Sequence, residues 1–404
     1  MMDMMTIQKD MPLLGQYIYL NTAAASAMPQ PVVNVMTSYL QKQASIGPYL
    51  PSFRKETYEQ VEQIREKTAL FIGAKKEEIA FVPNGSMAIN YISGGIDWQS
   101  DDEVIVLDTE MLSNYVPWLA LQQRGVHLKV LKTNADYMVD LQELEQLITP
   151  RTRLIAFAHM SNAAGALQPA REICRLAQQN NVLTFMNANQ TVGLLPIHVA
   201  ELGCDFLVAS GRKWLRGPEG SGLLYVRQAL IPTITPIMIG WGSTNWDYEN
   251  NEYSFVETAK RFEPGCPVIP SILGLGAAID YANAIGMQPI YERVQQLTKY
   301  LIEQLKMIPG IVLYGPQNSE YRLSVTPFNI EGLAPDDVTN FLADQGIIIE
   351  AGTFMANTIM ERNHIRKMAR FSPHYFNTFE EIDSAVSSIK EFIELTKTKA
   401  PDSH

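Results

Sequence analysis

Short apolar runs rich in β-branched residues alternate with stretches of helical period along the first part of the chain. The runs lie at residues 79–82, 104–107, 127–131, 154–158, 183–186, 206–209 and 223–226. Helical stretches at 57–72, 113–123, 141–147 and 170–180 separate most of them. An alternation of this kind favours a mainly parallel sheet with helices on both faces. The sequence therefore predicts an α/β fold built on a mainly parallel, seven-stranded sheet.

The pattern changes after residue 265. The later helical stretches lie at 271–284, 289–307, 335–345 and 380–396, and strand-like runs lie at 311–313 and 321–327. This order predicts a smaller α+β domain. We expect an N-terminal arm at residues 1–20, a large domain at 21–265 and a small C-terminal domain at 266–404.

Composition excludes several classes of protein. With 404 residues, 46% of them hydrophobic, the chain can bury a full core. Its net charge of −11 disfavours nucleic acid and anionic membranes as partners. The three cysteines form no CxxC pair, so neither a disulfide framework nor a cysteine metal site is indicated. No stretch is long and apolar enough to cross a bilayer, and we expect a cytoplasmic protein.

Polar segments follow several of the predicted strands, where the ligand crevice of such a sheet lies. Gly85 and Ser86 open a helical stretch after the first run, which suits a phosphate, although Ser86 is equally suited to be a plain helix cap. Asn187, Asn189 and Gln190 follow the fifth run, and these amides need either a polar ligand or a network within the protein.

The segment Ser210-Gly211-Arg212-Lys213 follows the sixth run. A lysine beside an arginine can have its pKa lowered, so that its amine is free to attack a carbonyl group. A basic, solvated loop is the alternative interpretation, because lysines in loops are usually exposed.

Taken together, these segments resemble the class V aminotransferase family of fold-type-I enzymes, which use pyridoxal 5′-phosphate (PLP). The resemblance rests on the 210–213 segment with the following Gly217-Pro218-Glu219-Gly220, on Ser161-Asn162-Ala163-Ala164-Gly165, and on residues 187–190. It extends from about residue 19 to about residue 393 in the family's own order. Its branches include cysteine desulfurases, cysteine-conjugate C–S lyases and epimerase-like enzymes.

The resemblance implies a role for each matched position. Lys213 would be the catalytic Schiff-base lysine, and the large domain would bind PLP. The implied cofactor-binding residues are Gly85, Ser86, Met111, Asn162, Asn187, Asn189, Gln190, Ser210, Arg212, Lys213 and Cys266. Arg370 would hold the carboxylate of an amino acid substrate in a pocket bordered by Asn21 and Ala24, and no metal is implied. The family is usually a homodimer with shared active sites, to which the 261–266 segment of the other subunit contributes. Here that segment ends in Cys266 in place of a threonine.

Three departures from the family lead to a prediction of the reaction. Met355 stands where a desulfurase would carry its nucleophilic cysteine, and a thioether cannot form a persulfide. Met111 replaces the ring that stacks on the cofactor. Asn187 replaces the aspartate that keeps the pyridine nitrogen protonated, which weakens the ring as an electron sink. We therefore expect β-elimination or replacement by a C–S lyase-like enzyme and not a persulfide-forming desulfurase. The alternatives are an aminotransferase or epimerase and, more remotely, a non-catalytic relative.

Overall fold

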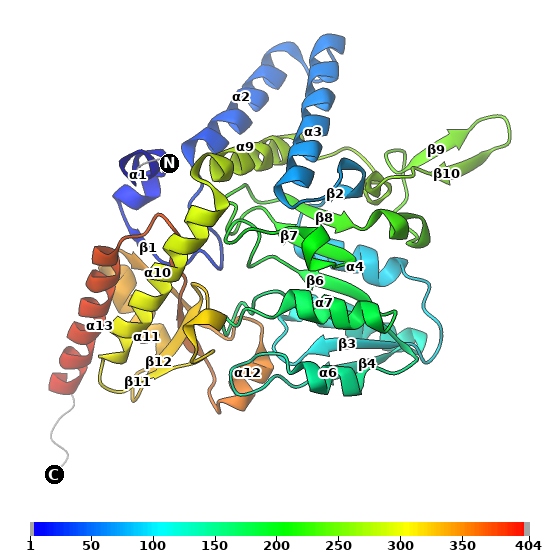
Figure 1. The fold of residues 1–404 in the computed structure, drawn as a ribbon. Coiled ribbons are helices and arrows are strands. Elements are labelled where there is room, and N and C mark those ends of the chain that lie inside the picture. The colour runs from blue at the N-terminus through cyan, green and yellow to red at the C-terminus, as the bar shows by residue number, and fades with distance from the viewer. Residues whose placement is uncertain (1–3, 400–404) are drawn as a thin grey trace.

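The main sheet confirms the predicted architecture. The computed structural model describes residues 4–399, so residues 1–3 of the expected arm and 400–404 of the expected small domain lie outside the described residues. Seven strands form one sheet in the order β2-β8-β7-β6-β5-β3-β4 (Figure 1). They are β2 (Ile79–Phe81), β3 (Glu103–Leu107), β4 (His127–Leu131), β5 (Thr152–Ala158), β6 (Leu183–Asn187), β7 (Phe206–Ser210) and β8 (Gly222–Val226). Only β8 runs against its neighbours, and the remaining pairs are parallel.

Both faces of this sheet are buried, as the continuous apolar runs predict. Within β3, Ile105 and Leu107 face one hydrophobic cluster, whereas Val104 and Val106 face the other. The first cluster is covered by α3 (Pro51–Phe71), α6 (Leu141–Leu147), α7 (Ala170–Gln179), α8 (Val199–Leu202) and α9 (Ile269–Ile285). The second is covered by α4 (Gly85–Gly95) and α5 (Val116–Leu119).

The expected helix at 113–123 is not one helix. Two 3₁₀ turns, Leu112–Asn114 and Ala120–Arg124, flank the four-residue α5. Pro117 lies in the first turn of α5 and has no backbone N–H, so a single α-helix that began at residue 113 would lack one of its hydrogen bonds there. The continuous helix is therefore interrupted just before α5.

A second, antiparallel sheet lies beside the first, with strand order β11-β12-β15-β14. Its strands are β11 (Ile311–Leu313), β12 (Thr326–Ile330), β14 (Glu350–Gly352) and β15 (Met368–Phe371). Its helices are α10 (Met287–Lys306), α11 (Pro335–Asp344), α12 (Asn357–Arg362) and α13 (Phe379–Lys399). This unit has the predicted α+β character, while the proposed limits of the domains stay a prediction.

The N-terminal part of the chain joins this second unit. Strand β1 (Ile18–Tyr19) pairs in parallel with β13 (Ile347–Ile348), and Asn21 bridges to Ser372. Helix α1 (Met4–Asp10) precedes β1, and α2 (Gln30–Ile46) packs against α9. No helix among the described residues is both long enough and apolar enough to cross a membrane.

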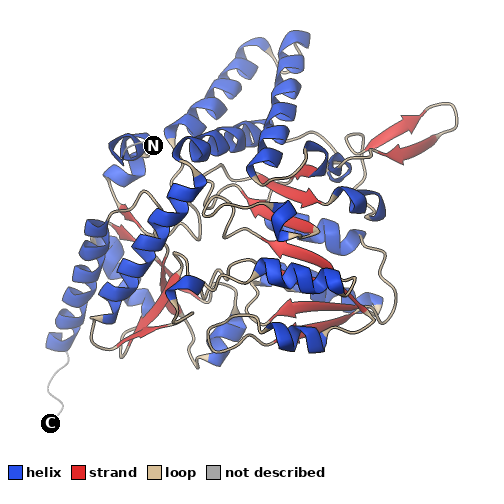
Figure 2. Cartoon of the chain, in the orientation of Figure 1, coloured by secondary structure: helices blue, strands red, loops and turns tan. Residues whose placement is uncertain are grey.

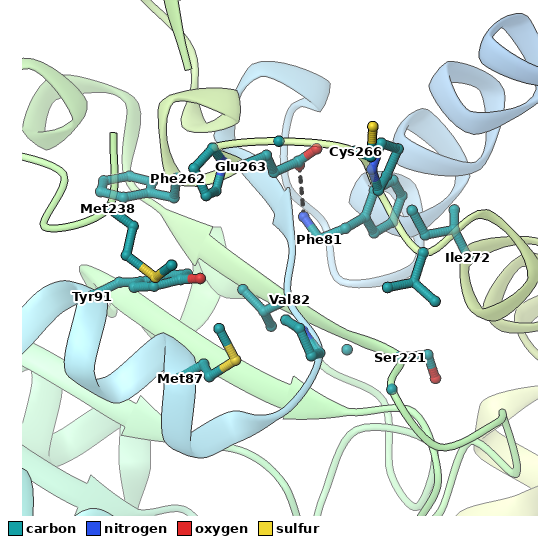
Figure 3. Close-up of a pocket in the computed structure, with 17 residues that line it drawn as sticks. Phe81, Val82, Met87, Tyr91, Ser221, Met238, Phe262, Glu263, Cys266 and Ile272 are labelled. Atoms are coloured by element: carbon teal, nitrogen blue, oxygen red, sulfur yellow. Dashed lines mark hydrogen bonds between the residues drawn. The ribbon is translucent and has the colours of Figure 1, made fainter. Parts of the chain in front are cut away.

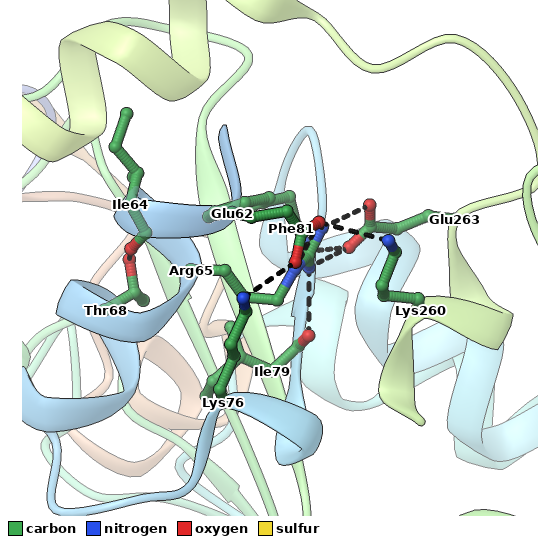
Figure 4. A network of polar contacts seen from close by, with 9 residues as sticks. All are labelled: Glu62, Ile64, Arg65, Thr68, Lys76, Ile79, Phe81, Lys260 and Glu263. Atoms are coloured by element: carbon green, nitrogen blue, oxygen red, sulfur yellow. Dashed lines mark hydrogen bonds and ion pairs between the residues drawn. The ribbon is translucent and has the colours of Figure 1, made fainter. Parts of the chain in front are cut away.

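A hairpin of β9 (Thr244–Asp247) and β10 (Glu252–Phe255) projects from the body of the molecule (Figure 2). An ion pair joins the segment that follows the hairpin to helix α3 and the main sheet (Figure 4). The buried Arg65 of α3 donates from Nη2 to Oε2 of Glu263 across 3.0 Å and from Nη1 to the carbonyl of Ile79 across 3.0 Å. Oε1 of Glu263 also accepts from the backbone N–H of Phe81 at 2.8 Å. One carboxylate thus ties β2, α3 and this segment together.

Candidate active site

A polar cavity of about 110 Å³ lies at the carboxyl ends of the parallel strands. Its lining includes all the predicted cofactor-binding residues except Cys266: Gly85, Ser86, Met111, Asn162, Asn187, Asn189, Gln190, Ser210, Arg212 and Lys213. Asn84, Ser113, Ala158 and Met160 complete it. Segments that are far apart in the sequence meet here because parallel strands end at the same edge of the sheet.

One wall of the cavity is the N-terminus of α4. Asn84 caps this helix by accepting from the backbone N–H of Met87 at 3.0 Å, so the cap is Asn84 and not Ser86. Gly85 lies so close to Asn189 that an added Cβ would be 2.5 Å from Nδ2 of that residue. The free N–H groups of this first turn are suited to an anionic group.

Lys213 lies in the loop after β7 and lines the same cavity. Burial, followed by the charges of Arg370 and Arg212, lowers the pKa of Lys213 to about 7. The neighbouring Trp214 is fully buried, and its indole N–H donates to Oε1 of Gln190 across 2.7 Å. The loop is therefore anchored, and a substantial fraction of the amine is neutral near pH 7. It is not the solvated basic loop of the alternative interpretation.

The amides at the end of β6 form part of a network within the protein. Oδ1 of Asn187 accepts from the backbone N–H of Asn189 at 3.1 Å and from its Nδ2 at 2.7 Å. Nε2 of Gln190 donates to the carbonyl of Ala23 at 3.1 Å, so both ends of its amide are engaged. Oδ1 of Asn189 is buried and has no hydrogen-bond partner among residues 4–399. This network leaves the Asn189 oxygen and the Asn187 amino group to a ligand.

Arg370 of β15 lies beside this cavity and is 2% exposed. Its Nη1 donates to the carbonyl of Asn162 at 2.8 Å, and its Nη2 donates to Glu350 at 2.8 Å and to Oδ1 of Asn21 at 3.5 Å. Burial lowers the pKa of Arg370 to about 10, while the carboxylate of Glu350 opposes this change. The guanidinium remains charged at neutral pH and is suited to hold a carboxylate.

The loop that carries Met355 closes against the same residues. Nδ2 of Asn162 donates to the carbonyl of Phe354 at 2.8 Å, and the ring of Phe354 lies 3.9 Å from the Arg370 guanidinium. The backbone N–H of Leu112 donates to the carbonyl of Met355 at 3.0 Å. The side chain of Met355 points outward and is 53% exposed. Asn162 therefore holds this loop, and its predicted bond to the cofactor stays a prediction.

Besides Arg370, three predicted residues lie outside the cavity lining. Asn21 touches Arg370, and Ala24 lies nearby in the loop that bonds Gln190 through Ala23. Cys266 lines a separate, mostly apolar hollow of about 250 Å³ together with Phe81, Met87 and Met238 (Figure 3). That hollow is larger than the polar cavity, but Lys213 lines the polar cavity and not this hollow. The polar cavity is therefore the candidate active site.

Two residues of the site carry no sequence signal that would reveal them. Glu350 is recognisable only once β14 is paired with β15, which places it opposite Arg370. Phe354 contributes its ring and its carbonyl to the site. Its backbone has a φ of 52°, a left-handed conformation that is not expected for a phenylalanine.

A buried lysine with a lowered pKa, a helix N-terminus suited to phosphate and a buried arginine define a PLP-dependent enzyme on an α/β fold. Comparison with known proteins gives the family. The model of the family described as Aminotransferase class-V matches residues 18–384, and this chain belongs to that family.

Several relatives are similar over nearly their whole length. The probable cysteine desulfurase of Methanothermobacter thermautotrophicus is 34% identical over 390 residues, which cover 95% of this chain and 97% of that protein. A cysteine desulfurase of Escherichia coli is 34% identical over 397 residues, with the same coverage. Among solved structures, a cysteine desulfurase from Thermococcus onnurineus NA1 superposes with a TM-score of 0.92 at 30% identity, covering 98% of this chain and 99% of the other.

These relatives overturn the predicted reaction. β-Elimination or replacement was expected in preference to a persulfide-forming desulfurase, but the similar chains are named cysteine desulfurases. The expectation rested on the chemistry of Met355, Met111 and Asn187 alone. Similarity over 95% of the chain outweighs three positions, and Met355 excludes a persulfide only at its own place in the loop.

The residues of the cavity fit PLP. The first turn of α4 with Ser210 and Arg212 offers donors for a phosphate, and Lys213 offers an amine for the aldehyde. The unpartnered oxygen of Asn189 marks a place for a polar partner, and Gly85 leaves room for the Asn189 side chain against the first turn of α4. When bound, PLP supplies a ring that withdraws electrons from the amino acid attached to it.

Proposed function

We propose that this protein is a cysteine desulfurase, which transfers the sulfur of cysteine to a thiol and leaves alanine. The observation that carries the proposal is the placement of a partly neutral, buried Lys213 amine within the electrostatic reach of the Arg370 guanidinium. An α-amino acid has an amino group for the end of the site at Lys213 and a carboxylate for the end at Arg370. The names of the relatives that are 34% identical to this chain support cysteine as that amino acid.

Each residue of the site has a proposed task. Lys213 would bond covalently to the cofactor aldehyde and later move the proton at Cα of the substrate. Gly85, Ser86, Ser210 and Arg212 would hold the phosphate. The proposed contacts of the ring are Met111, Asn162, Asn187, Asn189 and Gln190. Arg370, bordered by Asn21 and Ala24, would hold the substrate carboxylate.

The sulfur acceptor must be a thiol, and the loop offers none at Met355. Burial raises the pKa of Cys174 to about 12, and burial also raises the pKa of Cys204 well above its usual range, so both are poor nucleophiles. Cys266 is the only exposed cysteine of the three in the chain. We therefore propose that Cys266 takes the sulfur. Its thiolate attacks the substrate sulfur, the bond from sulfur to Cβ breaks, and protonation of the carbon skeleton gives alanine.

This acceptor requires a second subunit. Cys266 lines a different hollow of its own chain, and we propose a homodimer in which the 261–266 segment of each subunit reaches the site of the other. A sedimentation measurement should give twice the mass of the chain, and a monomer at working concentration would contradict this part of the proposal. The free cysteines support a cytoplasmic location, and the net charge of −11 supports a small molecule over nucleic acid or a membrane as partner.

Product analysis tests the reaction. The holoenzyme incubated with cysteine and an added thiol should form alanine and a persulfide in equal amounts. Pyruvate and ammonia without alanine would refute the desulfurase assignment. Mass spectrometry should find the added sulfur atom on Cys266 after one turnover without added thiol. Cys266→Ser should abolish that sulfur atom, whereas the matched variant Cys204→Ser should retain it.

A further inference from the structure

A carboxylate lies next to the arginine that would receive the substrate. Glu350 of β14 is the residue directly opposite Arg370 of β15 in the antiparallel pair, so both side chains project from the same face of the sheet. Oε2 of Glu350 accepts from Nη2 of Arg370 at 2.8 Å. Strand pairing therefore fixes this contact.

The other donors of Arg370 are nearly all committed. Nη1 bonds the carbonyl of Asn162, Nη2 is shared between Glu350 and Asn21, and the ring of Phe354 covers one face of the guanidinium. Nε is buried and has no hydrogen-bond partner among the described residues. An arriving carboxylate that bonds Nε and Nη2 together would have to displace Glu350 from Nη2.

Glu350 can leave because it is only half-buried. Its side chain is 41% exposed, whereas that of Arg370 is 3% exposed. A carboxylate at this depth regains water when its partner is taken, so releasing it costs less than leaving the arginine unpaired. The pair is thus asymmetric: the arginine is fixed, and the glutamate is replaceable.

The charge of Glu350 also acts on the space between Arg370 and Lys213. Glu350 raises the pKa of Lys213 and of Arg370, which places its carboxylate within electrostatic reach of both cations. A substrate held by these two groups has its side chain in the same field. A second acidic group on that substrate would meet a like charge.

We propose that Glu350 determines substrate specificity: its carboxylate competes for Arg370 and repels a second acid, so the site accepts amino acids with neutral or basic side chains. Amino acids with a β-carboxylate or β-sulfinate are rejected. This inference rests on the proposed role of Arg370 in holding the substrate carboxylate, and it adds a selection between cysteine and its acidic analogues.

Equilibrium binding to the holoenzyme tests the proposal without turnover. Calorimetry with propionate and succinate compares one carboxylate with two in ligands that lack an amine. The wild type should prefer propionate, and Glu350→Gln should shift the ratio of the two affinities towards succinate by roughly tenfold, since one close charge repulsion is removed. The matched control Glu331→Gln removes an exposed carboxylate elsewhere in the same part of the chain and should leave the ratio unchanged.

If the ratio of the affinities for propionate and succinate is unchanged in Glu350→Gln, the proposal is overturned. This holds even if the variant has a lower melting temperature, because the carboxylate would then contribute only to stability. Loss of propionate binding in Arg370→Lys is expected, and its retention at full affinity overturns the shared premise. In steady state, Glu350→Gln should gain kcat/KM for cysteine sulfinate relative to cysteine. If the wild type forms no alanine, the desulfurase proposal fails by itself, while the binding ratios still decide the role of Glu350.

Discussion

The indole N–H of Trp214 donates to the side-chain oxygen of Gln190 across 2.7 Å, which joins the residue after Lys213 to the segment that follows β6. The other end of the same amide donates to Ala23. Three distant parts of the chain therefore meet at one side chain, and the position of the lysine depends on all of them. The amine is held in place before any ligand arrives.

Lys213→Ala should abolish both turnover and the absorbance of bound PLP, because the proposed covalent attachment is lost. In the wild type, the rate of PLP uptake by the cofactor-free protein should rise as the pH passes about 7, where burial and the two arginines place the pKa of Lys213. Absorbance spectroscopy follows both effects. The control Lys132→Ala removes an exposed lysine and should change neither, whereas an uptake rate that rises only near pH 10 would contradict the assignment.

Asn187→Asp tests whether this residue faces the ring nitrogen. An aspartate there would stabilise the protonated ring and strengthen electron withdrawal, so exchange of the Cα hydrogen of alanine with solvent deuterium should quicken about tenfold or more. Nuclear magnetic resonance measures this exchange. Asn181→Asp adds the same charge at an exposed position and serves as the control. Equal rates in all three proteins would show that Asn187 does not act on the ring.

Glu110 gives the folded protein a distinct pH dependence. Burial raises its pKa to about 8, so the folded state holds a proton that the unfolded state loses near pH 4.5, and stability should fall as the pH rises between these values. Burial lowers the pKa of His159 to about 4, which makes stability rise with pH only up to its ordinary value of 6.5. Between pH 6.5 and 8, Glu110 makes the protein less stable as the pH rises, whereas Lys213, whose pKa is lowered to about 7, acts in the opposite direction above that value. The contribution of Glu110 is therefore the difference between the wild type and a variant that lacks its carboxyl group.

Between pH 6.5 and pH 8, the carboxyl group of Glu110 should lower the free energy of unfolding by about 2 kcal/mol, since one pKa unit corresponds to about 1.4 kcal/mol. This contribution should be absent in Glu110→Gln. Urea unfolding at pH 6.5 and pH 8 measures the difference. The glutamine can still accept from the backbone N–H of Ala158, a bond of 2.6 Å in the wild type. A variant that keeps the full pH dependence would assign it to another group.

The ion pair between Arg65 and Glu263 should matter for stability far more than a surface pair. Glu263→Gln leaves the buried Arg65 with only its longer ion pair to Glu62, at 3.4 Å, which should lower the free energy of unfolding by about 3 kcal/mol. Glu56→Gln breaks the exposed pair with Lys42 and should change it by less than about 1 kcal/mol. Denaturant unfolding of both variants tests the contrast, and equal losses would refute it.

The main sheet and most of the cavity could be predicted from the sequence because both follow from local pattern. Each of the seven apolar runs became a strand, and strand ends in a parallel sheet converge, so residues such as Gly85, Asn187 and Lys213 had to meet. The short strands β14 and β15 escaped prediction because they carry no alternating pattern of useful length. Their pairing is a long-range event, and with it the contact between Glu350 and Arg370 was missed.

The predicted reaction failed for a different reason. Met355 has no thiol and Asn187 has no charge, but the chemistry of one position does not exclude a reaction in which another residue of the chain takes part. Exposure is what distinguishes Cys266 from the two buried cysteines, and exposure is a property of the fold.

The pairing of β1 with β13, and of Asn21 with Ser372, has a consequence for biosynthesis. A nascent chain released from the ribosome only as far as β8 already contains every strand of the main sheet and the lysine. It has neither Arg370 of β15 nor strand β13, which pairs with β1 and keeps the N-terminal residues in place. If Arg370 has its proposed role, capture of an amino acid must therefore wait until the chain has been synthesised past β15.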